Sequence, residues 1–273
     1  PITLSIWYTE RSCPTIVFLP GTMSHPLMYE NFLCGLSERG FNIIGVHYLS
    51  HGKSPKIKKN YIMEDMLHNV YDATTYGIEN FGENIAVMGS SQGGILAAMA
   101  AGRDTRLKAI FPHNIMLTTL KETMSLTKYP AWSHRFMGLI QWGFRVGGKL
   151  LPNYKVPGDA YLDYDRVFYS EQAKQDCLND PMLLPYYPLR FVASLFNADL
   201  SCLENGAIQC PVILITAKGD PLFSFDYTNK VFDLIHAPQK ELLTLELNRH
   251  MIFNEDTDTT INALEPTLHK YLG

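Results

Sequence analysis

The first half of the chain alternates two hydrophobic patterns. Short apolar runs of strand length occur at 15–19, 41–46, 85–88 and 107–111. Stretches in which apolar residues recur every three or four positions, as on one face of a helix, occur at 27–38, 61–80 and 92–102. Strands that alternate with helices of this length predict an α/β fold, with a parallel sheet covered by helices on both faces. Right-handed crossovers then fix the winding of that sheet.

The alternation stops between about residue 113 and residue 205. This segment is rich in aromatic residues and methionine, and six prolines divide it into short pieces with no strand alternation. We expect an all-helical insertion placed after a strand of the sheet. The alternation resumes with strands at 211–216 and 241–245 and helices at 225–235 and 256–271. The predicted organisation is a core formed by residues 1–112 and 206–273, with a helical cap at 113–205.

The segment Gly89-Ser90-Ser91-Gln92-Gly93 has the pattern G-x-S-x-G between a predicted strand and a predicted helix. The pattern alone is common, because glycine and serine are abundant, but a serine on a sharp strand-to-helix turn is a nucleophile elbow. Such a turn needs small flanking residues, and the chain has glycine at 89, 93 and 94. The prediction is that Ser91 is the nucleophile and that Ser90 is only its neighbour.

A nucleophilic serine needs a base, and the base needs an acid that orients it. In folds with this elbow, the order along the chain is serine, then Asp or Glu, then histidine. Asp220 follows the predicted strand 211–216, and His250 follows the predicted strand 241–245. Carboxyl ends of parallel strands meet at one edge of the sheet, where α/β proteins place their sites. The predicted catalytic triad is therefore Ser91, Asp220 and His250.

Other residues are weaker candidates. Asp199 and Asp226 do not directly follow a strand. The remaining histidines precede or closely follow the serine, or lie in helix-like stretches: His25, His47, His51, His68, His113, His134, His236 and His269. Asp220 and His250 also have plainer interpretations. The tripeptide Gly-Asp-Pro favours a turn, so Asp220 could be only a turn residue, and His250 could be a solvated loop histidine.

An oxyanion hole needs two backbone N–H donors, each worth about 3 kcal/mol. One donor is expected from Gln92, the residue after the nucleophile, and the other from the loop that follows strand 15–19. In that loop Thr22 is the first choice and Met23 the second. The alternative is that Pro20-Gly21 forms a plain turn, which would leave the loop without a catalytic role.

Composition narrows the class of protein. A chain of 273 residues with 46% hydrophobic and 18% charged residues is typical of a folded globular protein. The net charge of −4 argues against a nucleic-acid surface, and the lysines at 53, 56, 58 and 59 are expected on a solvated loop. Five widely spaced cysteines favour reduced thiols and a cytoplasmic setting. No metal-ligand spacing, signal peptide or membrane-spanning stretch is evident, although a start at Pro1 leaves a removed leader open.

These motifs resemble the α/β-hydrolase superfamily and, within it, monoacylglycerol lipase and lysophospholipase-like serine hydrolases. The resemblance spans nearly the whole chain. The segments that carry it are Leu19-Pro20-Gly21-Thr22, Ser50-His51-Gly52-Lys53-Ser54-Pro55, 89–94, Asn179-Asp180-Pro181, 210–220 and 250–255. It implies a mostly parallel sheet of about eight strands, a mobile cap, and neither metal nor cofactor. Two positions depart from the family pattern, which usually has histidine at Pro20 and an acidic residue at His47.

The sequence therefore predicts a hydrolase of carboxylic esters that forms an acyl-enzyme on Ser91. The aromatic cap suggests an apolar pocket for an acyl or aromatic ester, with Trp132, Trp142, Phe144 and Met116 as candidate lining residues. The same aromatic residues could instead form only the core of the cap. An acyltransferase or thioesterase with the same triad stays open, as does a non-catalytic ligand-binding homologue. Expected partners are small-molecule esters, with neither nucleic acid nor stable membrane insertion; the sequence does not indicate an oligomeric state.

Overall fold

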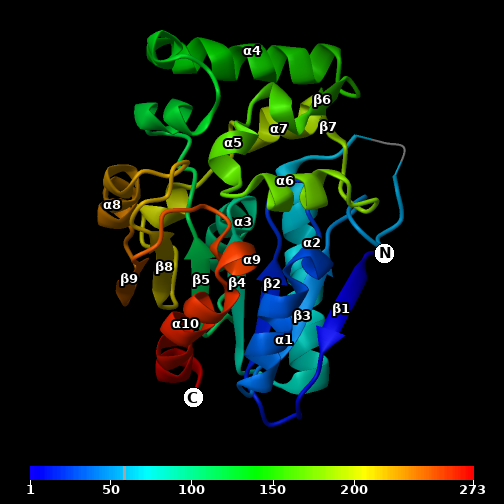
Figure 1. Cartoon of the computed structure of the whole chain (residues 1–273), viewed down its shortest axis with the longest axis vertical. Helices are drawn as coiled ribbons and strands as arrows, with labels where there is room; N and C mark the ends of the chain where they lie inside the picture. The colour runs from blue at the N-terminus through cyan, green and yellow to red at the C-terminus, as the bar shows by residue number, and fades with distance from the viewer. Residues whose placement is uncertain (58–59) are drawn as a thin grey trace.

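The computed structural model describes residues 1–57 and 60–273, and its centre is a twisted seven-stranded sheet (Figure 1). In chain order its strands are β1 (Thr3–Trp7), β2 (Thr15–Leu19), β3 (Asn42–His47), β4 (Ile85–Ser90), β5 (Ala109–His113), β8 (Val212–Ala217) and β9 (Lys240–Leu245). Their order across the sheet is β1-β3-β2-β4-β5-β8-β9. Every neighbouring pair is parallel except β1 and β3, which are antiparallel. The predicted α/β class with a mostly parallel sheet is confirmed.

The number of strands differs from the expectation of about eight. Over the described residues, β1 forms one edge of the sheet and β9 the other, with no further strand beside either. Strand β1 itself was not predicted, because its five residues, Thr-Leu-Ser-Ile-Trp, form too short an alternating run to stand out. It pairs with β3 from Thr3 opposite His47 to Trp7 opposite Ile43.

Helices cover both faces of the sheet because neighbouring side chains of each buried strand point to opposite sides. Along β2, Ile16 and Phe18 pack in one core and Val17 and Leu19 in the other. The helices of the core are α1 (Glu30–Glu38), α2 (Met63–Phe81), α3 (Gln92–Ala101), α8 (Phe225–Leu234), α9 (Ile252–Glu255) and α10 (Thr257–Leu272), preceded by the 3-10 turn η1 (Pro26–Tyr29). Helices α1, α9 and α10 supply the core shared with Ile16, and α2, α3 and α8 supply the core shared with Val17.

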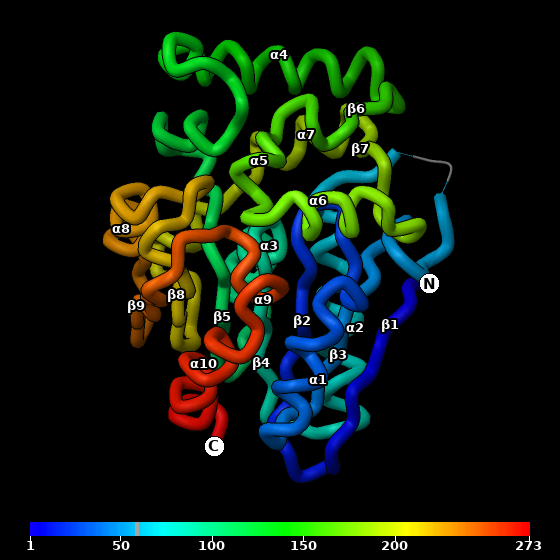
Figure 2. Tube along the Cα trace, in the orientation of Figure 1, coloured from blue at the N-terminus to red at the C-terminus, as the bar shows by residue number. Residues whose placement is uncertain are grey.

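The insertion lies above the carboxyl ends of the strands, in the green and yellow part of the chain (Figure 2). Its α-helices are α4 (Met137–Leu150), α5 (Tyr164–Val167), α6 (Glu171–Leu178) and α7 (Leu189–Leu195). Its 3-10 turns are η2 (Lys121–Leu126), η3 (Ala131–Phe136), η4 (Gly158–Ala160) and η5 (Ser201–Leu203). We call this segment the cap; its exact limits, 113–205, stay a prediction.

The expectation that the cap is entirely helical is wrong. It contains a small antiparallel ribbon of β6 (Lys155–Pro157) and β7 (Tyr186–Pro188). Each strand has three residues and ends in proline, which lacks the N–H that would continue a ladder. Strands this short have no detectable period-two pattern, so the sequence gives no signal for them.

Three expectations from composition concern the surface and the thiols. All five cysteines are free thiols. None of the helices in the described part of the chain combines the length and apolarity that a membrane span requires. Lys53 and Lys56 of the predicted lysine-rich loop are exposed, whereas Lys58 and Lys59 lie outside the described residues.

Candidate active site

Ser91 occupies a strained position between β4 and α3. Its backbone has φ 52° and ψ −110°, in a region that few residues other than glycine adopt. Its N–H donates to the His113 carbonyl oxygen on β5 at 2.9 Å, which fixes the turn to the neighbouring strand. Strain of this kind persists only where surrounding structure determines it, and it is frequent at functional sites.

The three glycines around Ser91 are there because nothing larger fits. A Cβ atom on Gly89 would overlap the backbone of Gly93, and one on Gly93 would overlap the Leu19 carbonyl oxygen. A Cβ atom on Gly94 would overlap the Asn114 carbonyl oxygen. The elbow is therefore packed directly against β2 and the end of β5.

Asp220 and His250 come together at the carboxyl ends of β8 and β9. His250 donates its Nδ1 proton to Asp220 Oδ2 at 2.8 Å, and both side chains are buried. Asp220 Oδ1 accepts the backbone N–H groups of Leu222 at 2.8 Å and Phe223 at 2.9 Å. The Phe223 ring stacks on the imidazole with 5.4 Å between ring centroids. His250 is thereby fixed in the tautomer whose other nitrogen, Nε2, is free to accept a proton.

The electrostatics keep Asp220 ionised. Burial raises the pKa of this carboxyl, but attraction to His250 and the hydrogen bonds from His250 and Phe223 outweigh burial, so its pKa lies below the ordinary value. An ionised, hydrogen-bonded carboxylate is the group that can orient an imidazole and stabilise its protonated form.

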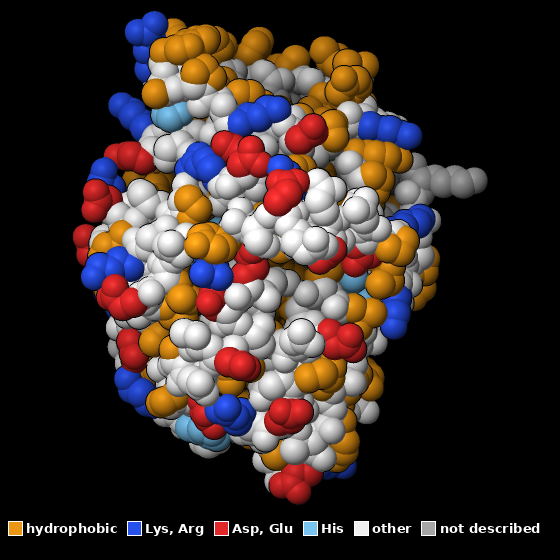
Figure 3. All heavy atoms as spheres, in the orientation of Figure 1, with side chains coloured by type: hydrophobic (Ala, Val, Ile, Leu, Met, Phe, Trp, Pro, Cys, Tyr) orange, Lys and Arg blue, Asp and Glu red, His pale blue; other side chains and the backbone are white. Residues whose placement is uncertain are grey.

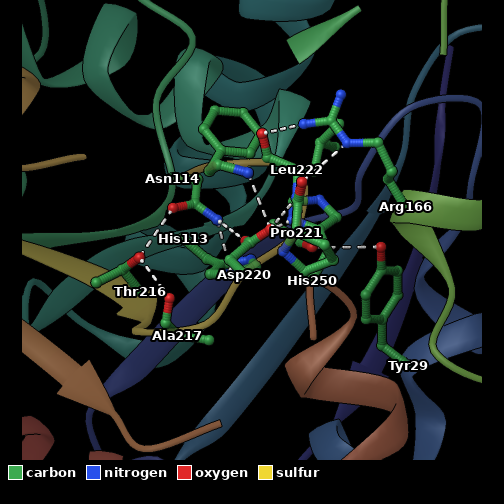
Figure 4. A network of polar contacts seen from close by, with 12 residues as sticks. Tyr29, His113, Asn114, Arg166, Thr216, Ala217, Asp220, Pro221, Leu222 and His250 are labelled. Atoms are coloured by element: carbon green, nitrogen blue, oxygen red, sulfur yellow. Dashed lines mark hydrogen bonds and ion pairs between the residues drawn. The ribbon is translucent and has the colours of Figure 1, made fainter. Parts of the chain in front are cut away.

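The sequence analysis missed two neighbours of this pair. Asn114 donates from Nδ2 to Asp220 Oδ2 at 2.9 Å, and His113 lies with its ring centroid 5.2 Å from that of His250 (Figure 4). Burial and repulsion from His250 lower the pKa of His113 to about 3, so this imidazole is neutral. The sequence analysis ranks His113 lower because it closely follows the serine, although His113 and Asn114 come just after the predicted strand 107–111, which was the available signal.

The loop that carries Asp220 is also held from the cap. Arg166 of α5 donates to the carbonyl oxygens of Pro221 at 2.8 Å and Leu222 at 3.1 Å (Figure 4). Its remaining nitrogen donates to the Ser125 carbonyl oxygen at 2.8 Å. One arginine therefore links two parts of the cap to the acid loop.

His113, Asp220 and His250 are also the group of described residues best placed to hold a metal ion, with ligand atoms within 4.8 Å of one another. Both oxygens of Asp220 already accept two hydrogen bonds each. His113 Nε2 accepts a further bond from Asn114 at 3.0 Å. A metal would have to replace several of these bonds, so we interpret the group as a hydrogen-bonded network.

Two apolar cavities meet at Ser91. Both are lined by Thr22, Ser91, Leu162 and Leu222. The larger one also contains His250 and is lined by Met28, Tyr29, Tyr164, Val167, Phe168, Cys177, Leu178, Leu183 and Met251, among others. The second extends between core and cap along Ile95, Met116, Leu126, Tyr161, Leu195, Phe196 and Phe223. No Asp or Glu side chain lines either cavity within the described residues.

Residues 10–257 match the family described as serine aminopeptidase, S33 (Hydrolase_4). The chain belongs to this family. Its members carry the α/β-hydrolase fold, so the predicted resemblance to that superfamily is confirmed. Among proteins of curated function, none matches the sequence significantly.

Solved structures resemble this S33-family chain over its whole length. The monoacylglycerol lipase of Paleococcus ferrophilus has a TM-score of 0.80 and 18% identity, over 99% of each chain. A soluble variant of Saccharomyces cerevisiae monoglyceride lipase, bound to a substrate analogue, has a TM-score of 0.77 and 14% identity, covering 100% of this chain and 92% of that one. The Butyrivibrio proteoclasticus protein Est1E, bound to ferulic acid, has a TM-score of 0.65 and 16% identity, over 99% and 96% of the chains. At these identities the likeness shows the fold.

In this S33-family protein, the predicted pocket residues lie in different places. Met116 lines the second cavity beside Ser91, and Phe144 stacks behind its wall on Phe196 with 5.0 Å between ring centroids. Trp132 and Trp142 are 67% and 58% exposed and line neither cavity, so their expected place in the pocket is corrected. They belong to η3 and α4, in the part of the molecule where hydrophobic side chains gather at the surface (Figure 3). The sequence does not distinguish the outer face of a cap from its inner face.

One predicted oxyanion donor belongs to the elbow, and the other belongs to the loop after β2. Thr22 lines both cavities next to Ser91, and Gln92 is the first residue of α3. The Met23 N–H is already donated to the hydroxyl of Tyr187 at 2.8 Å, which weakens the second choice. Met23 and Ser91 both have positive φ angles, which residues other than glycine rarely adopt. The loop after β2 and the elbow therefore each have an unusual backbone conformation.

Of the two departures from the family pattern, His47 has a clear structural role. Its Nδ1 accepts the Lys53 N–H at 3.1 Å, so its Nε2 donates to Ser5 Oγ at 3.0 Å. A Cβ atom on Gly52 would overlap this ring, which explains glycine in the turn. His47 thus holds the loop of residues 50–54 to β1. Pro20 accepts a long hydrogen bond of 3.4 Å from the Tyr48 hydroxyl through its carbonyl oxygen.

Proposed function

We propose that this protein hydrolyses carboxylic esters through an acyl-enzyme on Ser91. The observation that carries the proposal is that Ser91 and His250 line one apolar cavity, with Asp220 bonded to the far side of the imidazole at 2.8 Å. Family membership and the likeness to lipases and esterases support the same reaction class.

In the proposed reaction, His250 Nε2 removes the Ser91 hydroxyl proton as Oγ attacks the ester carbonyl carbon. The amides of Thr22 and Gln92 stabilise the tetrahedral oxyanion. His250 then gives the proton to the departing alkoxide, and an acyl-enzyme and an alcohol result. Water, deprotonated by His250, attacks the acyl-enzyme and releases the carboxylic acid, which restores Ser91.

The cavities suggest the class of substrate. Both are lined mainly by aliphatic and aromatic side chains, so we propose an acyl or aromatic ester whose two arms are largely apolar. An aminopeptidase would need a group to bind the substrate's α-ammonium ion. The absence of Asp and Glu from the described cavity linings favours esters over peptides with a free amino end.

A panel of p-nitrophenyl esters of increasing acyl length tests the proposal, beside an acyl-CoA thioester and an aminoacyl p-nitroanilide. The Ser91→Ala variant is expected to lose at least about 10⁴-fold in kcat/KM with its fold preserved, because no other group can form the acyl-enzyme. Covalent labelling by a fluorophosphonate, seen as a mass shift on Ser91, separates an enzyme from a ligand-binding homologue. Full activity in Ser91→Ala would overturn the proposal.

The same panel decides between the remaining alternatives. Faster turnover of the thioester, or an ester product formed with an added alcohol, would assign a thioesterase or acyltransferase with the same triad. A flat dependence on acyl length would remove the argument from the apolar cavities.

A further inference from the structure

Tyr187 is a cap residue whose hydroxyl group lies in the core. It belongs to β7, has no exposed surface, and contacts three separate segments of the core. Its hydroxyl oxygen lies 2.8 Å from the Met23 backbone nitrogen, 3.2 Å from Gln92 Nε2 and 3.0 Å from His51 Nε2. The sequence analysis did not single out this tyrosine.

The direction of each hydrogen bond follows from the partners. His51 Nδ1 lies 2.9 Å from the Leu49 carbonyl oxygen, which can only accept, so the ring proton is on Nδ1 and Nε2 is an acceptor. Burial lowers the pKa of His51 to about 4, in keeping with a neutral ring. The Tyr187 hydroxyl therefore donates to His51 and accepts from Met23 and Gln92, which uses its one proton and both of its lone pairs.

Two of these partners border the proposed oxyanion hole. Met23 directly follows Thr22, and the second residue, Gln92, would itself provide the other backbone donor. The cap holds Met23 from both sides, because the Leu184 N–H also donates to the Met23 carbonyl oxygen at 3.0 Å. Gln92 is buried, so its side chain cannot replace Tyr187 with water as a partner.

We infer that Tyr187 is a positioning residue that sets the distance between the Thr22 and Gln92 amides and thereby couples the cap to oxyanion stabilisation. This inference rests on the proposed function and adds a residue to it. Tyr187 touches neither the substrate cavities nor the reacting atoms; it acts through Met23 and Gln92. A misplacement of donors by about 1 Å is enough to cost orders of magnitude in rate.

The test compares Tyr187→Phe with Tyr61→Phe. Tyr61 packs beside Tyr187, with 6.5 Å between ring centroids, and its buried hydroxyl has no hydrogen-bond partner among the described residues. Both variants remove one buried hydroxyl from the same aromatic cluster. Tyr187→Phe is expected to lower kcat by roughly 10- to 100-fold with KM changed by less than about threefold, because the lost interaction acts mainly in the transition state. Tyr61→Phe is expected to keep the wild-type kcat.

A second readout follows the oxyanion directly. An alkylboronic acid forms a tetrahedral adduct with the nucleophilic serine, with an oxygen in the oxyanion position. Its inhibition constant should rise in Tyr187→Phe by the same factor as kcat falls, whereas a role in stability alone would change only the unfolding midpoint. If Tyr187→Phe does not fold, Gln92→Met carries the same test, because it removes the side-chain donor to the hydroxyl together with a weak 3.6 Å bond to Met66 Sδ.

The possible outcomes separate the two proposals. Absence of ester turnover in the wild type would overturn the proposed function and this inference with it. Wild-type turnover together with an unchanged kcat and boronate affinity in Tyr187→Phe, or in Gln92→Met if it is used, would overturn the inference alone.

Discussion

Replacing Asp220 by asparagine changes one atom at the centre of the network. Asp220 Oδ2 accepts the His250 Nδ1 proton at 2.8 Å and an Asn114 Nδ2 proton at 2.9 Å, while Oδ1 accepts two backbone N–H groups. In Asp220→Asn the amide oxygen keeps the backbone bonds, so the amide nitrogen faces two donors. The imidazole then accepts at Nδ1 and carries its proton on Nε2, the nitrogen that the mechanism needs as a base.

The size of the effect follows from these contacts. The wrong tautomer removes the general base, and the equivalent change in serine proteases costs about 10⁴-fold in kcat, or about 5.5 kcal/mol of transition-state stabilisation. Two hydrogen bonds to a buried carboxylate, each worth about 1.5–3 kcal/mol, are also lost, and only the one to His250 is replaced, by a weaker neutral bond. We therefore expect kcat to fall by about 10³- to 10⁴-fold and the free energy of unfolding to fall by a few kcal/mol.

The assay is p-nitrophenyl ester turnover at pH 7, normalised to folded protein, with urea unfolding measured on the same samples. Asp226→Asn is the matched control, because Asp226 is an exposed residue in the first turn of α8. Asp226→Asn should leave kcat and the free energy of unfolding close to their wild-type values. Retention of more than a tenth of the wild-type kcat by Asp220→Asn would refute the orienting role of Asp220.

Two further predictions concern stability. Gly94→Ala should lower the free energy of unfolding by about 1–3 kcal/mol, because its Cβ would overlap the Asn114 carbonyl oxygen, whereas Gly143→Ala in α4 has open space and should raise it by up to about 1 kcal/mol; equal urea midpoints for the two variants would contradict this. Burial lowers the pKa of His51 from 6.5 to about 4, so between these pH values its imidazole is protonated in the unfolded chain and neutral in the folded chain. His51 therefore contributes stability above pH 6.5 that is lost as the pH falls to about 4. The loss is about 3 kcal/mol, and His113 adds to it down to about pH 3. Urea unfolding at pH 7 and pH 4.5 measures the difference, and a flat profile would be evidence against it.

The sequence predicted the parts of the fold that follow from long, regular patterns. The inner strands of the parallel sheet, β2, β3, β4, β5 and β8, are mostly apolar and buried along their whole length, and α2 spans nineteen residues with one apolar face. Ser91, Asp220 and His250 could be predicted because each follows a strand, and parallel strands bring their carboxyl ends together. Each prediction needed only local pattern and topology.

The parts that could not be predicted depend on contacts between distant segments. Tyr187 reaches Met23 across 164 positions of the chain, and Asn114 reaches Asp220 across 106. The structure of the cap was harder to predict for the same reason. Its short helices are divided by prolines, and the sequence does not show which side of each helix faces the core. Trp142 and Phe144 are two residues apart on α4, yet Trp142 is exposed and Phe144 stacks on Phe196.

The place where the cap enters the sheet has a consequence for folding. Strands β5 and β8 are neighbours in the sheet, yet the whole cap lies between them in sequence. Closing a loop of about a hundred residues costs about 4 kcal/mol of chain entropy before the pairing returns any contacts. The strands that carry Ser91 pair over shorter separations, so the nucleophile's turn is expected to form early, with Asp220 and His250 arriving late. Folding of the cap shortens that loop, so we expect the rate at which the two halves of the site meet to depend on the cap.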